Sequence, residues 1–78
     1  MQRASFIMIK HFTKTQGTKA YRVPVIFMDN PDKETVKRVE EILENTPYEG
    51  DYWDRVNFSV NLGKAGITGA VPMCAEQI

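Results

Sequence analysis

Few residues in this chain are able to do chemistry. His11 is the only histidine and Cys74 is the only cysteine. A general base needs a nucleophile or a water to deprotonate and a partner that orients it, and the sequence around His11 marks neither. One cysteine and one histidine cannot complete a four-ligand zinc site or an internal disulfide. We therefore expect no catalytic residue, no metal and no cofactor, with His11 at the surface of a strand.

The glycine-rich segment 63–69 and a group of acids are the remaining candidates for chemistry. Ala65 follows a lysine where a phosphate-binding loop needs a hydroxyl for magnesium, so we interpret the segment as a hairpin turn. Glu49, Asp51 and Asp54 are close enough in sequence to share a cation, but they lack the calcium-loop spacing. The sequence predicts a protein that is not an enzyme.

Charge is distributed unevenly along the chain, although its total is zero. Residues 1–28 contain five cations and no acid, whereas residues 29–54 contain nine acids and three cations. Such asymmetry favours association with an oppositely charged partner, and tyrosine and tryptophan are typical interface anchors. We therefore expect a partner-binding surface made of acids and two aromatic residues: Glu40, Glu41, Glu44, Glu49, Asp51, Tyr52, Trp53 and Asp54. The alternative is an ordinary solvated helix face with i,i+4 pairs, each worth about 0.2–0.5 kcal/mol.

The partner that this surface predicts is a larger protein with a basic surface. Glu40 and Glu44 lie one helical turn apart, about 6 Å, which is close to the spacing of neighbouring backbone phosphates. An acidic helix of this kind can occupy a groove meant for nucleic acid. By analogy with other proteins of this size, the sequence suggests an inhibitor from a phage or mobile element that disarms a host defence system.

A second hypothesis is nucleic-acid binding by the basic N-terminal hairpin. Its cations alternate with rings that are able to stack on unpaired bases, namely Lys10, Lys14, Lys19 and Arg22 with Tyr21. The isoelectric point of 6.6 is low for such a protein. Lysines also protect exposed sheet edges from unwanted pairing, which explains the same residues without any ligand.

The N-terminal half of the chain predicts a hairpin followed by a helix. Residues 4–13 and 21–28 are apolar and rich in β-branched and aromatic residues, and a polar loop separates them. Pro24 lacks a backbone N–H, which predicts a sheet edge or a bulge for the second strand. Asn30 and Pro31 are a typical helix start, and Pro47 ends the helix near residue 45 or 46.

The C-terminal half predicts a second hairpin. Val56, Phe58, Val60 and Leu62 alternate with polar residues, which is the pattern of an antiparallel strand with one buried face. Residues 67–73 contain a glycine and a proline and predict a short edge strand. The expected fold is a two-layer α+β domain of order ββαββ, in which one helix covers a four-stranded, mainly antiparallel sheet.

Length and composition limit the remaining possibilities. A chain of 78 residues has room for one small domain, residues 1–78, and its longest apolar runs are far too short to cross a bilayer. The lone cysteine and the absence of a signal-peptide pattern predict a reducing, cytoplasmic setting. Self-association through a sheet edge or an open sheet face is a further expectation.

Overall fold

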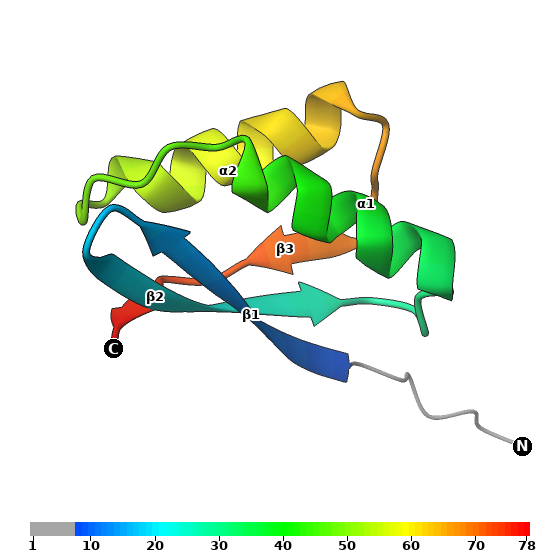
Figure 1. Cartoon of the computed structure of the whole chain (residues 1–78). Coiled ribbons are helices and arrows are strands. Elements are labelled where there is room, and N and C mark those ends of the chain that lie inside the picture. Colours follow the sequence, from blue (N-terminus) through cyan, green and yellow to red (C-terminus); the bar gives the residue numbers. More distant parts are fainter. Residues whose placement is uncertain (1–7) are drawn as a thin grey trace, which may run out of the picture.

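The computed structural model describes residues 8–78, and part of the expected strand 4–13 lies outside them. Two helices lie on one face of a four-stranded antiparallel sheet (Figure 1). The order along the chain is β1 (Met8–Gln16), β2 (Lys19–Phe27), α1 (Lys33–Glu44), α2 (Trp53–Lys64), β3 (Ala70–Pro72) and β4 (Glu76–Gln77). The two helices run in opposite directions above the sheet.

The sheet is centred on β2. Strand β1 pairs with the whole length of β2, from Met8 opposite Phe27 to Gln16 opposite Lys19. On the other side of β2, β3 pairs with residues 25–27 and β4 pairs with residues 21 and 22. The connection between β1 and β2 is shorter than the loop expected at 13–20, because the ladder continues to Gln16 opposite Lys19. Thr13 and Thr15 favour this extension of β1, and the φ of +62° at Gly17 suits a tight turn.

Pro24 lies in the central strand, so the prediction of an edge position was wrong. Its carbonyl accepts a hydrogen bond from the Met73 N–H at 2.8 Å. The N–H and C=O of one strand residue point to the same side, so the missing donor of Pro24 faces the interval between β3 and β4. The segment that pairs with this side of β2 is therefore interrupted between β3 and β4, at the residue of β2 that has no backbone N–H.

Helix α1 begins two residues later than the sequence predicted. Its N-cap is Asp32, not Asn30, and the Asp32 carboxylate accepts a hydrogen bond from the Thr35 backbone N–H at 2.8 Å. This bond lowers the pKa of Asp32. The C-cap is Asn45, as expected from Pro47.

The prediction of a strand at residues 56–62 was wrong, and with it the ββαββ fold with one helix. Residues 53–64 form the helix α2. Its buried residues are Asp54, Phe58 and Leu62, which are four apart and therefore lie on one helix face, while Val60 is exposed. The apolar alternation fits a strand, but the four-residue spacing lets a helix bury Phe58 and Leu62 against the sheet and α1.

The segment expected to be a hairpin turn at 63–66 is the end of α2. Gly66 has a φ of +77°, its N–H donates to the Gly63 carbonyl, and the Ile67 N–H donates to the Leu62 carbonyl. These two bonds are the Schellman arrangement, which satisfies the last carbonyls of a helix and favours glycine at the position of Gly66. The chain then turns into the short strand β3.

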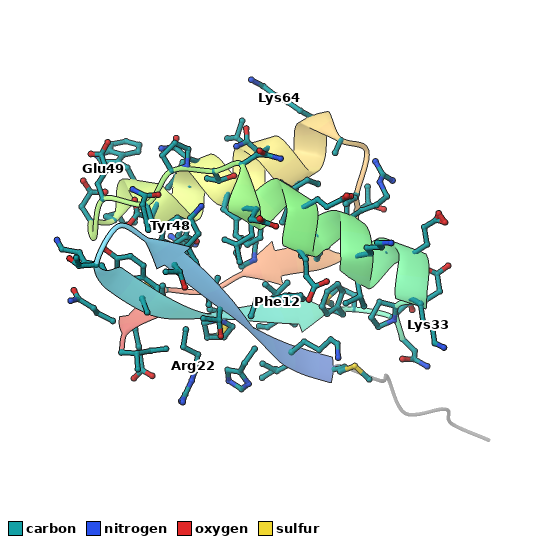
Figure 2. The ribbon with its side chains drawn as sticks, viewed as in Figure 1. Phe12, Arg22, Lys33, Tyr48, Glu49 and Lys64 are labelled. Atoms are coloured by element: carbon teal, nitrogen blue, oxygen red, sulfur yellow. The ribbon has the colours of Figure 1, made fainter. Side chains whose placement is uncertain are left out.

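The core lies between the helices and the sheet. Phe12 and Tyr48 point into this layer in Figure 2, whereas Arg22 points away from the helices on the opposite face of the sheet. The buried apolar residues are Phe12, Tyr21, Val23, Val25, Phe27, Val39, Leu43, Tyr48, Phe58, Leu62 and Ile67. Because both helices cover the same face, the other face of the sheet has no helix on it.

Candidate functional site

The structure divides the predicted acidic surface into two parts. Glu40, Glu41 and Glu44 lie exposed on α1. The other predicted residues lie in or next to the connection between the helices, where Figure 2 shows Glu49 at the far end of the molecule from Lys33.

The acids on α1 are mixed with cations. Glu40 and Glu44 line a groove of about 440 Å³ together with Lys14 of β1. Glu41 shares a neighbouring shallow depression with Lys37 and with other charged residues of both signs. Only a third depression, at the end of α1, is lined by acids without a cation, namely Glu41 and Glu44 with Asn45. Most of this side of α1 carries both signs, which fits the alternative of an ordinary solvated face.

Lys14 holds the end of α1 in place. Its side chain is only 6% exposed, and its Nζ donates to the carbonyl oxygens of Leu43 at 3.0 Å and Glu44 at 2.8 Å. The last carbonyls of a helix lack partners within the helix and carry partial negative charge, so a cation there stabilises the helix end. Burial lowers the pKa of Lys14, and the Glu44 carboxylate partly opposes this effect.

We call residues 45–52, which join α1 to α2, the strap. Side chains from other elements hold its backbone. The Gln16 side chain accepts from the Tyr48 N–H at 2.8 Å, and its amide also donates to the Tyr48 carbonyl. The buried Thr46 hydroxyl donates to the Ile42 carbonyl and accepts from the Asn61 side chain. The first half of the strap is thereby tied to β1, α1 and α2.

Asp54 holds the second half of the strap. This residue is 6% exposed, and its carboxylate accepts from the backbone N–H groups of Glu49 at 2.8 Å, Gly50 at 2.7 Å and Asp51 at 3.1 Å. A carboxylate with three amide donors is occupied by its own chain. Asp54 is therefore a positioning residue, and it is removed from the predicted partner-binding surface.

Tyr52 and Trp53, which we call the aromatic pair, are both 60% exposed. Their rings meet edge to face with centroids 5.5 Å apart, and the Arg55 guanidinium lies 5.4 Å from the centroid of the Tyr52 ring. The Trp53 backbone N–H donates to the Asp51 carboxylate at 3.0 Å. Tyr52 is the N-cap of α2 and Trp53 is its first residue. The pair therefore directly follows the part of the strap that Asp54 holds.

A pocket of about 310 Å³ lies beside the aromatic pair. Tyr21 and Arg55 both line it, and the Tyr21 hydroxyl and the Arg55 Nε are buried without a hydrogen-bond partner in the protein. Tyr21 is 3% exposed, and a Cβ placed on Gly50 would lie 3.3 Å from its hydroxyl oxygen. Tyr21 and Arg55 therefore line this pocket together with the C-terminal residues Cys74 and Ala75.

The basic hairpin does not present its residues as one surface. Lys14 and Tyr21 are buried and engaged in the core. Lys10 lies under the start of α1, where it lines a shallow groove with Glu40. Lys19 adjoins the turn, and Arg22 is on the uncovered face of the sheet beside Glu76. The cations expected to grip a nucleic-acid backbone are thus dispersed over different sides of the hairpin.

Within residues 8–78 the structure shows no group of three metal-ligating side chains, and no helix there is long and apolar enough to cross a membrane. His11 and Cys74 are both exposed. Comparisons with protein-family models, with curated proteins and with solved structures found no match for this chain. The site is therefore interpreted from its own geometry.

Sequence reasoning missed the role of Arg55. The signal was present, because Tyr52 and Arg55 are three residues apart and share a face once residues 53–64 form a helix. The strand predicted at residues 56–62 left Tyr52 in the preceding junction and gave it no relation to Arg55. The correct secondary structure was needed to find the pair.

Proposed function

We propose that this protein is a non-enzymatic binding module that docks onto a larger protein through the aromatic pair. The observation that supports this proposal is an exposed Tyr52 and Trp53 on a backbone that Asp54 holds with three hydrogen bonds. Aromatic side chains supply much of the binding energy of protein interfaces, and a fixed backbone reduces the entropy lost on binding.

The charges around the pair favour a partner with a basic surface. Glu49 and Asp51 are exposed next to the aromatic pair, where rim charges accelerate docking with an oppositely charged surface. Proteins that handle nucleic acid carry the most basic surfaces, which keeps an inhibitor of such a protein as the specific form of the proposal. The lone thiol of Cys74 fits a reducing, cytoplasmic setting.

The pocket beside the aromatic pair is the second part of the proposed interface. The Tyr21 hydroxyl and the Arg55 Nε–H are donors that lack an acceptor in the protein. Both atoms are buried in the free protein, so only a rearrangement of the pocket on binding would bring them to an acceptor of the partner. The proposed partner covers this pocket together with the aromatic pair.

The test is quantitative capture from a nuclease-treated lysate with three forms of the protein. The double variant Tyr52→Ser with Trp53→Ser is compared with the wild type and with Val60→Ser, a matched change of an exposed residue on the same helix. We expect the partner to be lost only with the double variant. Equal capture by all three forms, or capture that disappears with nuclease treatment alone, would contradict the proposal.

A further inference from the structure

Strand β1 is an edge strand of the sheet, and its outer side is unpaired. Among residues 8–78, β2 is the one strand that pairs with it. The pairing is continuous over the nine residues of β1, without a bulge, and β1 contains no glycine or proline. Unpaired N–H and C=O groups on a long, regular edge are a template for another strand, and native proteins usually shorten, bend or cover such edges. The backbone of β1 is therefore able to pair with a further strand.

The backbone groups that face outward belong to alternate residues of β1. The Pro24 carbonyl accepts from Met73 on the β3 side of β2, so Pro24 does not bond to His11, which lies opposite it on β1. The N–H and C=O of His11 consequently point away from β2, and every second residue of the strand has the same direction. The outward-facing residues are Ile9, His11, Thr13 and Thr15, and all of them are exposed.

We propose that β1 pairs with β1 of a second copy of this chain, so that the two sheets join edge to edge in an antiparallel ladder. The outward-facing residues are spaced symmetrically about Phe12. A two-fold axis perpendicular to the sheet, between the two Phe12 residues, therefore matches this pattern with itself. Every outward-facing N–H and C=O group then has a partner, in about eight hydrogen bonds between the copies.

The side chains on the face without helices are compatible with this register. Ile9 lies opposite Thr15 of the second copy, and His11 lies opposite Thr13 of the second copy. Each of these pairs contains a threonine, so no two charged side chains are directly opposite each other on this face. β-Branched and aromatic residues are also those that fit best across paired strands.

The groove between β1 and α1 supplies the charge complementarity. It is lined by Glu40 and Glu44 of α1 and by Lys14 of β1, which is one more acid than cation. The register brings Lys10 of the second copy opposite Lys14, on the side of the sheet that α1 covers. Each groove then contains two glutamates and two lysines, so the second copy supplies the cation that the groove lacks.

The two lysines that meet in this register have different tasks. The Lys14 Nζ is held by the carbonyl oxygens of Leu43 and Glu44 at the end of α1. Lys10 is exposed, and its ammonium group has no such partner among the printed hydrogen bonds of the helix end, so it is able to turn toward the carboxylates of the groove. An unrelated strand would match the backbone of β1 but would not have to bring a cation to this position.

This interface is independent of the docking surface proposed above. The pocket beside the aromatic pair is lined by Cys74, Ala75 and Gln77, and this segment pairs with β2 on the side opposite β1. A dimer joined at β1 therefore leaves both aromatic pairs accessible. Failure of either proposal leaves the other untouched.

The first experiment is sedimentation equilibrium of the full chain over a range of concentrations, with two variants of one residue. The Thr13 N–H faces outward, so Thr13→Pro removes a donor to the second copy without removing a bond to β2. Thr13→Val keeps the N–H and the β-branched shape. We expect the wild type and Thr13→Val to form dimers. Thr13→Pro should weaken self-association by about 100-fold, because the substitution enters the interface twice.

The second experiment tests the charges, and it decides the matter if Thr13→Pro fails to fold by circular dichroism. Lys10→Glu alone and Glu40→Lys alone each place an excess of one sign in both grooves and should weaken self-association by about tenfold. An equimolar mixture of the two variants restores two acids and two cations to each groove, so we expect a heterodimer as stable as the wild-type dimer. A wild type that is monomeric at every concentration, a folded Thr13→Pro that still forms the dimer, or a mixture that associates no better than its components would overturn the proposal.

Discussion

The strap with the adjoining aromatic pair and the face of the sheet without helices both expose large apolar side chains, but different groups hold them in place. The sheet rests on a backbone ladder in which β2 pairs with a strand on each side. The strap has no such ladder, and its backbone is held by the side chains of Gln16 and Asp54. Single substitutions should therefore disturb the strap far more than the sheet.

The comparison also shows how charged residues divide between two tasks. Lys14 and Asp54 are the buried charged residues of the part of the chain that the structure describes, and both satisfy backbone groups. Glu49 and Asp51 stay at the surface next to the aromatic pair, where Asp51 accepts one hydrogen bond from the Trp53 backbone N–H. The buried charged residues thus stabilise the fold, whereas the exposed ones are accessible to a partner.

The largest effect is expected from Asp54→Ala. Three strap N–H groups lose their acceptor in a partly buried site, and we expect the free energy of unfolding to fall by about 3–4 kcal/mol. Urea denaturation followed by circular dichroism measures this change. Asp51→Ala is the control, since Asp51 is exposed and accepts a single hydrogen bond from Trp53, and it should cost less than about 1 kcal/mol.

The next effect is expected from Lys14→Met, which keeps the aliphatic stem and removes the two hydrogen bonds to the end of α1. We expect a loss of about 1–2 kcal/mol. Lys10→Met on the same strand is the matched control, because Lys10 is exposed, and it should stay within about 0.5 kcal/mol of the wild type. Equal losses in the two variants would show that Lys14 does not hold the helix end.

A smaller effect, of opposite sign, is expected from Tyr48→Phe. The Tyr48 hydroxyl is buried without a partner, so removing it should stabilise the protein by about 1 kcal/mol. Burial, and then the negative charge of Asp54, raise the pKa of Tyr48 above its ordinary value of 10.0. The folded state thus holds this proton more tightly than the unfolded state does.

The sign of the pH dependence follows from that difference. The contribution of Tyr48 to stability is complete below pH 10.0, the ordinary value, and is lost as the pH rises further. Urea midpoints measured on both sides of this pH should fall less steeply for Tyr48→Phe than for the wild type. Tyr52→Phe removes an exposed hydroxyl and should leave the slope unchanged; an identical slope in all three proteins would contradict the assignment.

The smallest effects are expected from two glycines at the end of α2. Gly66 has a positive φ, so Gly66→Ala should cost about 1 kcal/mol. Gly63 lies within the helix with open space around its Cα, so Gly63→Ala should stabilise by up to about 0.5 kcal/mol. Thermal melting distinguishes the two signs. A destabilising Gly63→Ala would argue against a helix at residues 53–64.

The first hairpin and α1 were predictable because their signals are local. Apolar β-branched residues recur through β1 and β2, and α1 combines a regular apolar stripe with a proline beyond its end. Helix α2 was not predictable from its alternation, because Val56, Phe58, Val60 and Leu62 all fit one strand face, whereas only Phe58 and Leu62 share the buried face of the helix. Only packing against the sheet and α1 decides between them, and that information is not local.

The candidate site shows the same division. The exposure of Tyr52 and Trp53 agrees with their expected role at a surface, and their aromatic character was enough to select them. The burial of Lys14 and Tyr21 depends on contacts between segments far apart in the chain, such as Lys14 with Leu43. Asp54 instead bonds to the neighbouring residues 49–51. Charge counted along the sequence cannot distinguish these residues from solvated ones.

The central claim is that the protein acts by binding a partner with the aromatic pair. Amide hydrogen–deuterium exchange of the free protein and of the captured complex tests this claim most directly, because it reports protection segment by segment. The account predicts slower exchange in the complex at residues 49–57 and at the pocket-lining residues 74–77, with β1 unchanged. Protection confined to α1 or to the β1–β2 hairpin, with residues 49–57 unaffected, would contradict it.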